Sequence, residues 1–132
     1  MLDILRTHEF LQQRLAEFFK QFQLTPTQYN ILRILRGAGT DGLTCSQAAE
    51  RMISGDPDIT RLLDRLHSRG LIERERSHED RRVVISRITA AGLELITAID
   101  KPLGALLKRH ISPPGKQKLQ VLIRILESIR ET

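Results

Sequence analysis

Apolar residues recur at steps of three and four over most of the chain, and this period predicts a protein built mainly of helices. In the first stretch, Leu11, Leu15, Phe18 and Phe22 form such a stripe. The period predicts helices over residues 2–22, 25–37, 44–52, 56–69, 90–110 and from 112 onward. Residues 71–76 and 83–88 are rich in Ile, Val and Arg, which predicts two strands joined by residues 77–82.

Polar residues mark where several of these helices begin. Thr25 and Thr44 are each followed three residues later by Gln, the pattern of a capping box. Asp56 and Pro57 predict an N-cap and a first helical residue for the fourth helix. Thr89 is expected to cap the fifth helix. The helix starts are therefore predicted by the capping residues as well as by the apolar period.

The order of these elements predicts the fold. Two short helices separated by a tight turn have the layout of a helix-turn-helix, and the two strands that follow make a wing. The expected fold class is mostly α with a small β-hairpin wing (α+β), in a single domain over residues 1–132. The expected division is about 25–89 for a winged helix-turn-helix lobe, with flanking dimerisation helices over about 1–22 and 90–132.

The fourth helix has an apolar face and a polar face. Its apolar face carries Ile59, Leu62, Leu63 and Leu66, which are spaced to contact the core. Arg can donate twice to guanine, Asp can accept from cytosine, and Thr can serve either base or touch a thymine methyl. The residues predicted to face the major groove are Thr60, Arg61, Asp64 and Arg65, with Asp58 at the helix start. The alternative interpretation is a solvated charged face.

Arginine is concentrated in this region, since residues 61–87 hold 8 of the chain's 16 arginines. The whole chain has 21 basic and 16 acidic residues and a net charge of +5, so attraction to a polyanion depends on clustering. At the wing tip, Asp80, Arg81 and Arg82 predict a minor-groove probe, with an ordinary salt-bridged turn as the alternative. The residues expected to contact phosphate more weakly are Ser46, Gln47, Arg74 and Arg76. Arg69 and Arg87 are interpreted as phosphate contacts or surface pairs.

Composition narrows the remaining classes of function. The single cysteine, Cys45, excludes an intrachain disulfide and fits a reducing cytosol; we expect it to be a packed small residue. Apolar runs are shorter than the ~20 residues of a membrane span, and the N-terminus lacks a signal-peptide layout, so a cytoplasmic protein without membrane contact is expected. The four histidines lack metal-ligand spacing. Without nucleotide-binding or nucleophile motifs, neither a cofactor nor enzymatic activity is expected.

Five segments of the chain resemble the MarR-type (multiple-antibiotic-resistance regulator) transcription factors in order and spacing. They are residues 24–29 (LTPTQY), 59–66 (ITRLLDRL), 69–74 (RGLIER), 80–82 (DRR) and 88–92 (ITAAG). The resemblance covers nearly the whole chain and implies a homodimeric winged helix-turn-helix protein. It implies that Arg82 enters the minor groove and that Asp80 positions it, which ranks Arg82 above Arg81. Asp58 departs from the Ser, Ala or Thr common near that position in the family.

The flanking helices carry more apolar surface than the lobe alone needs, which points to a second copy of the chain. The predicted dimer residues are Leu119, Leu122, Ile123, Leu126 and Ile129. The alternative is that this stripe closes a monomer core. Many proteins of the resembled family bind a small ligand between the dimer interface and the DNA-reading lobes. The residues guessed for such a pocket are His8, Phe10, Arg14 and Tyr29.

These observations predict a sequence-specific regulator of transcription that binds double-stranded DNA. We expect a homodimeric repressor of a pseudopalindromic operator, with release by a small aromatic ligand. The alternative is a winged-helix module that binds proteins and does not read DNA. An RNA-binding winged helix is disfavoured, because only five aromatic residues are present and most have core spacing.

Overall fold

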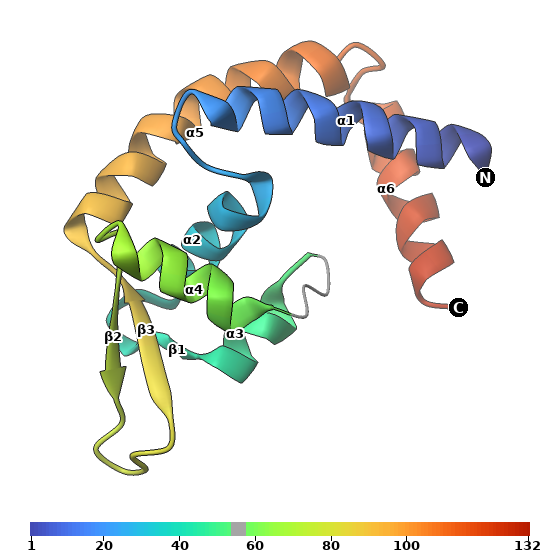
Figure 1. Cartoon of the computed structure of the whole chain (residues 1–132). Coiled ribbons are helices and arrows are strands. Elements are labelled where there is room, and N and C mark those ends of the chain that lie inside the picture. The colour runs from blue at the N-terminus through green and yellow to red at the C-terminus, as the bar shows by residue number, and fades with distance from the viewer. Residues whose placement is uncertain (54–57) are drawn as a thin grey trace. The chain divides into compact units, whose positions relative to one another are not determined.

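A computed structural model describes residues 1–53 and 58–132, which fall into two compact units, Met1–Thr97 and Ala98–Thr132. The first unit holds α1 (Leu2–Lys20), α2 (Pro26–Ala38), a short 3₁₀ turn η1 (Gly39–Asp41), β1 (Leu43–Thr44), α3 (Cys45–Arg51), α4 (Ile59–Ser68), β2 (Ile72–Arg76) and β3 (Val84–Ile88) (Figure 1). Helix α5 (Ala90–Ile111) begins in the first unit and ends in the second, which also holds α6 (Lys116–Arg130). The predicted class, mostly α with a small wing, is confirmed.

Side-chain caps set the starts of α2 and α3 as the sequence predicts. The Thr25 hydroxyl accepts from the Gln28 backbone N–H at 3.1 Å, and the Gln28 side chain accepts from the Thr25 N–H at 3.0 Å. Thr44 and Gln47 repeat the arrangement at 3.2 and 3.0 Å. Thr89 accepts from the Gly92 N–H at 3.1 Å, which confirms it as the cap of α5. Each cap satisfies backbone donors that a helix start would otherwise leave without partners.

Two helix starts differ from those predicted. Asp56 and Pro57, the expected start of the fourth helix, lie outside the described residues; the helix described there begins at Ile59 with Asp58 as its N-cap. The last helix begins at Lys116, not at Ser112. Its N-cap, Gly115, has φ of +91°, a backbone conformation that ends any regular helix running from Ser112. The Gly115 N–H donates to the Ser112 carbonyl at 2.9 Å and closes a turn instead.

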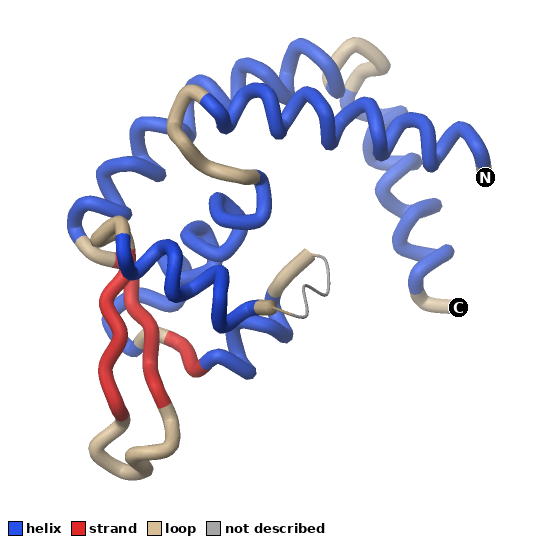
Figure 2. Tube along the Cα trace, in the orientation of Figure 1, coloured by secondary structure: helices blue, strands red, loops and turns tan. Residues whose placement is uncertain are grey.

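The sheet contains a strand that the sequence did not predict. Strands β2 and β3 pair antiparallel with Ile72 opposite Ile88 and Arg76 opposite Val84, and β1 adds to the other side of β3 (Figure 2). Strand β1 has two residues, too few to show a period. It is preceded by Gly42, whose φ is +66° and where a Cβ would lie 2.6 Å from the Ser86 carbonyl oxygen. Only glycine fits this approach to β3.

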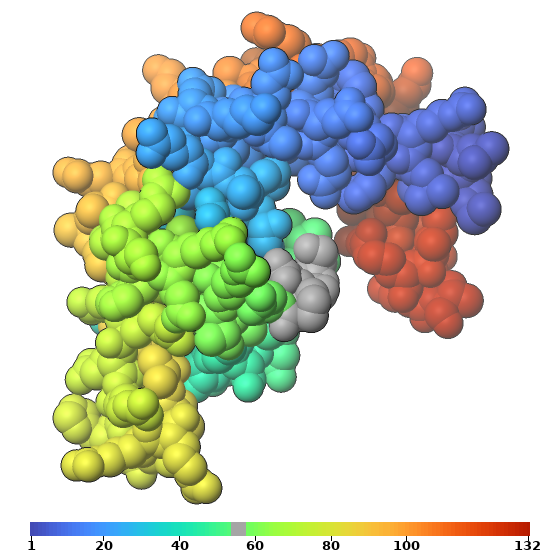
Figure 3. Space-filling view, viewed as in Figure 1, coloured from blue at the N-terminus to red at the C-terminus, as the bar shows by residue number. Residues whose placement is uncertain are grey.

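The core of the first unit lies beneath α4 and the sheet. Leu62, Leu63 and Leu66 of α4 are buried and Ile59 is half-buried, as the helical spacing predicts. Phe19 of α1 stacks on Tyr29 of α2 with ring centroids 4.7 Å apart. With its apolar side buried, α4 presents its polar side outward. The hairpin of β2 and β3 extends away from the helices as a narrow projection (Figure 3).

Candidate nucleic-acid interface

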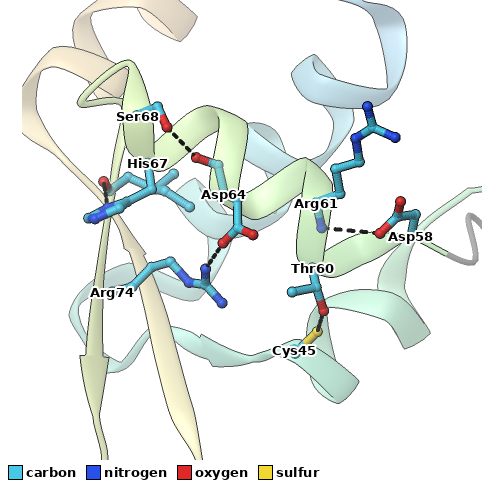
Figure 4. Close-up of polar contacts among 9 residues, drawn as sticks. Cys45, Asp58, Thr60, Arg61, Asp64, His67, Ser68 and Arg74 are labelled. Atoms are coloured by element: carbon cyan, nitrogen blue, oxygen red, sulfur yellow. Dashed lines mark hydrogen bonds and ion pairs between the residues drawn. The ribbon is translucent and has the colours of Figure 1, made fainter.

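The exposed face of α4 carries the residues that the sequence assigns to it. Thr60, Arg61, Asp64 and Arg65 are all exposed, and Figure 4 shows Thr60, Arg61 and Asp64 spread along the helix. Helix α3, which precedes α4 in the helix-turn-helix, is fixed by its own capping box. A rigid helix with a polar outer face is the kind of element that enters a major groove.

Arg61 and Arg65 are free cations on this face. Within residues 1–53 and 58–132, neither guanidinium forms a hydrogen bond or an ion pair with the protein. Together with Asp58 and Leu62 they line a shallow surface depression of about 200 Å³. Their donors are therefore available to an acidic partner.

Asp58, which the sequence left without a clear role, is a helix cap. Its carboxylate Oδ1 accepts from the Arg61 backbone N–H at 3.3 Å. A carboxylate at this position also interacts favourably with the positive end of the helix dipole. A structural reason for an aspartate at the start of α4 therefore exists without any base contact.

Asp64 and Arg74 are engaged with each other. The Asp64 carboxylate forms an ion pair with the Arg74 guanidinium, which reaches it from β2 (Figure 4). The Asp64 side chain is 60% exposed, whereas that of Arg74 is only 19% exposed. The predicted base contact of Asp64 and the predicted phosphate contact of Arg74 thus involve two groups that already have a partner within the protein.

The wing tip holds Arg82 in an exposed position. Asp80 Oδ1 accepts from both the backbone N–H and Nε of Arg82, at 3.0 and 3.3 Å. The Arg82 side chain remains 92% exposed. Arg76 donates to the Arg81 carbonyl at 2.8 Å and so holds the turn, while the Arg81 guanidinium has no partner within the described part of the chain. The aspartate therefore orients Arg82 without covering it.

Two further arginines have structural roles that the sequence pattern did not reveal. Arg69 donates to the carbonyls of Gln23 and Phe22, at 2.5 and 3.5 Å, and ties the end of α4 to the segment after α1. Arg87 donates to the Thr40 carbonyl at 2.7 Å and to Glu75 at 3.1 Å. Both contacts join residues more than ten positions apart, so only the folded chain shows them.

A concave surface of about 300 Å³ lies between α3, α4 and the wing. Its lining residues are Thr44, Cys45, Ser46, Thr60, Arg74, Arg82, Val83 and Val84. Cys45 Sγ lies 3.8 Å from the Thr60 hydroxyl, and its side chain is half-buried. Ser46 and Gln47 are exposed at the start of α3, although the Gln47 side-chain carbonyl already serves the capping box. Residues from the helix-turn-helix and from the wing thus border one surface.

The residues guessed for a ligand pocket lie on α1 and α2. His8, Phe10 and Arg14 are exposed on α1, with the Arg14 guanidinium 5.0 Å from the centre of the Phe10 ring. Tyr29, on α2, stacks on the buried Phe19. The geometry therefore pairs Phe10 with Arg14 and gives Tyr29 a place in the core packing.

The predicted dimer residues lie on α6. Leu122, Ile123 and Ile129 are about half exposed, while Leu119 and Leu126 are partly covered. Val121 and Ile125 are exposed as well, at 48% and 52%. The helix therefore presents a large apolar surface to its surroundings.

The described residues contain no group of three or more His, Cys, Asp or Glu side chains arranged to hold a metal ion. None of the helices among them is long and apolar enough to cross a membrane.

A helix-turn-helix followed by a β-hairpin wing defines the winged helix-turn-helix class. The MarR family profile matches residues 24–84, the part of the chain that forms this lobe. The uncharacterized HTH-type transcriptional regulator YfiV of Bacillus subtilis is 32% identical over 123 residues, with 88% of this chain and 75% of YfiV covered. The chain belongs to the MarR family of transcriptional regulators, whose members are DNA-binding proteins and not enzymes.

Solved structures agree with this assignment. A MarR transcription factor from Planctomyces limnophilus is 40% identical, with a TM-score of 0.77 and coverage of 96% of this chain and 91% of that one. The Staphylococcus aureus MepR–DNA complex has a TM-score of 0.75 at 24% identity, covering 99% and 96% of the two chains. The second likeness bears on the fold alone.

Proposed function

We propose that this MarR-family regulator represses transcription by binding a pseudopalindromic operator as a homodimer. In this proposal α4 lies in the major groove and the tip of the β2–β3 wing lies in the minor groove. The observation that carries it is the division among the arginines of residues 61–87. Arg61, Arg65 and Arg81 have no hydrogen bond or ion pair of their guanidinium groups within the described residues, and Arg82 is 92% exposed beside Asp80, whereas Arg69, Arg74, Arg76 and Arg87 donate to carbonyl or carboxylate oxygens of other residues.

Arg61 and Arg65 lie on α4 and Arg81 and Arg82 lie at the wing tip, and the two elements have different targets in the proposal. Arg61 and Arg65, one turn apart on α4, can donate to guanine N7 and O6 in the major groove. Arg82 suits the minor groove, because that groove is narrow and electronegative and the exposed Arg82 side chain is already restrained by Asp80. The MepR structure supports the arrangement by analogy, since it is a DNA complex of a protein with this fold.

The apolar surface of α6 supports the proposed dimer, and the exposed apolar residues at the start of the chain support it as well. Leu2, Ile4 and Leu5 of α1 and its N-cap Met1 are all about half exposed or more. Burying such surface against a second copy is the simplest use of it. A twofold dimer places its two recognition helices in successive major grooves, with half-site centres ~10 bp apart.

Release by a small aromatic effector is the finer part of the proposal. Arg14 over the Phe10 ring places a cation beside an aromatic face. These groups suit an aromatic carboxylate, whose carboxylate would pair with the guanidinium and whose ring would stack on the Phe ring. Adding such compounds to the operator complex should lower DNA anisotropy, and variants Arg14→Ala and Phe10→Ala should need more compound for the same release.

The test of DNA binding is the variant Arg82→Ala. It should weaken operator binding by ~1–3 kcal/mol and leave thermal unfolding unchanged, because the side chain is 92% exposed. Anisotropy titration at fixed salt, on an operator selected from a random duplex library, measures the loss. Arg81→Ala should weaken operator binding less. Arg6→Ala, which removes an exposed arginine from α1, should leave operator affinity unchanged.

The same titration separates the proposal from a module that binds only proteins. Such a module would elute from heparin at low salt and show no preference for any duplex. An operator affinity unaffected by Arg82→Ala would reject the role of the wing.

A further inference from the structure

The ion pair between Asp64 and Arg74 joins the recognition helix to the wing. Asp64 lies on the outer face of α4 between Arg61 and Arg65, and Arg74 lies in the middle of β2. The Asp64 carboxylate Oδ1 contacts the Arg74 guanidinium Nη1 (Figure 4). The pair therefore connects the two elements that, in the proposed function, enter different grooves.

Arg74 is poorly placed to leave this pair. It stands opposite Ser86 in the sheet, and Ser86 is 1% exposed. Arg74 Nε is itself buried and has no hydrogen-bond partner among the described residues. A largely buried cation is tolerated only with a compensating partner, and the Asp64 carboxylate supplies it. The Asp64 carboxylate thus compensates the Arg74 cation in the protein without DNA.

A second contact fixes the same two elements one turn further along α4. His67 Nδ1 lies 3.2 Å from the Ile72 carbonyl oxygen at the start of β2. Two links between a helix and a strand restrict the angle between them as well as their separation. The wing tip begins two residues beyond Arg74, after Arg76. A change at Asp64 would therefore alter how the tip is held relative to α4.

Arg74 and Arg82 also border the same concave surface, together with Thr60 of α4. Without the carboxylate of Asp64, the Arg74 cation would be left uncompensated beside the wing arginine.

We propose that Asp64 is a positioning residue and not a base-reading residue. Through Arg74 it sets the wing relative to α4, so that Arg82 reaches the minor groove while Arg61 and Arg65 occupy the major groove. The inference rests on the proposed operator binding. It differs from the sequence-based expectation, which gave Asp64 a contact with cytosine.

The test is the coupling between Asp64 and Arg82 in operator binding. Asp64→Asn removes the charge at nearly constant shape and should weaken binding about tenfold. In that background, Arg82→Ala should cause a much smaller further loss than it does in the unmodified protein, because the wing is already displaced. Arg61→Ala is the matched control, and its loss should be the same in both backgrounds. The exchange Asp64→Arg with Arg74→Asp should recover part of the affinity.

The outcomes are separable. Selection of bound duplexes by the Asp64→Asn protein should yield the unmodified protein's sequence preference with uniformly lower affinity. A changed preference at a single base pair, with the full Arg82→Ala loss retained, would make Asp64 a base reader. The inference is wrong, and the proposed function stands, if the affinity losses of Asp64→Asn and Arg82→Ala are fully additive. The same holds if Asp64→Asn leaves operator affinity unchanged. If the unmodified protein shows no preference for any duplex, both the inference and the proposed function are wrong.

Circular dichroism establishes that the variants fold. Where Asp64→Asn is unfolded, Asp64→Glu keeps the charge and displaces it by one methylene. The same loss of coupling to Arg82 is then expected from Asp64→Glu, and full additivity rejects the inference.

Discussion

Arg65 lies in the last turn of α4 and Arg69 is the C-cap of that helix, and both are exposed in the folded chain. Their surroundings nevertheless differ. The Arg69 guanidinium donates to the carbonyls of Gln23 and Phe22 at the end of α1. Gln23 has φ of +55°, a left-handed conformation that a residue with a side chain adopts only when its neighbours hold it. Arg69 is one such neighbour, whereas Arg65 has no comparable contact with any residue that the structure describes.

These two arginines predict opposite effects: one substitution should lower stability, and the other should weaken operator binding. Arg69→Ala should lower the free energy of unfolding by about 1 kcal/mol, because charge-assisted hydrogen bonds to two carbonyls are lost. Arg65→Ala should change stability by less than about 0.5 kcal/mol and weaken operator binding. Urea denaturation and anisotropy titration measure the two quantities. Equal effects of both variants on both quantities would remove the distinction between structural and DNA-facing arginines.

At the scale of elements, local sequence signals predicted most of the fold. The two capping boxes at Thr25 and Thr44 are complete in the structure, since each needs only residues three positions apart. The strands β2 and β3 are found within a residue of their predicted starts. The two-residue strand β1 escaped prediction, because its pairing with Ser86 and Ile85 depends on residues more than forty positions away.

The candidate site was predictable only in part, for the same reason. The exposure of Arg61 and Arg65 follows from helical spacing relative to the buried Leu62 and Leu66. The pairing of Asp64 with Arg74 does not follow, because it depends on where β2 packs against α4. Local spacing gives the face on which a side chain lies, whereas its partner is set by tertiary structure. The contacts predicted for these residues with DNA stay predictions.

The N-cap of α4 gives a prediction that separates helix stability from charge. Asp58→Asn should leave the free energy of unfolding nearly unchanged, because Asn and Asp cap helices about equally well. It removes one negative charge beside Arg61, so affinity for any duplex should rise modestly at low salt. Asp58→Ala should instead lower the free energy of unfolding by ~1 kcal/mol.

Titrations on an operator and on a random duplex check the first variant, and thermal unfolding checks the second. A loss of operator binding by Asp58→Asn without any change on random duplex would show that Asp58 contacts a base.

At the scale of the whole molecule, the proposed assembly depends on α6. Its exposed residues include Val121, Leu122, Ile123, Ile125 and Ile129. A stripe of this kind is stable in water when it is covered by apolar surface of a partner. The proposed operator symmetry requires that partner to be a second copy of the chain.

Ile129→Glu combined with Ile123→Glu should therefore convert a dimer to a monomer, because a charge buried at an apolar interface is strongly unfavourable. Sedimentation velocity measures the change in mass, and operator affinity should fall with it because one half-site is lost. Gln120→Glu, on the same helix, is the control and should remain dimeric. Unchanged mass of the double variant would assign the interface to other residues.

The contacts of Arg69, Arg74, Arg76 and Arg87 with other residues have a consequence for the salt dependence of the proposed DNA binding. Each Lys or Arg contact with phosphate makes non-specific affinity fall roughly three- to fourfold between 50 and 200 mM salt, and such contacts hold a protein on any duplex it meets. These four arginines already donate to oxygen atoms of the protein, so they are less available to phosphate than arginines without a partner. The non-specific affinity should therefore depend less steeply on salt than the number of arginines in the sequence suggests.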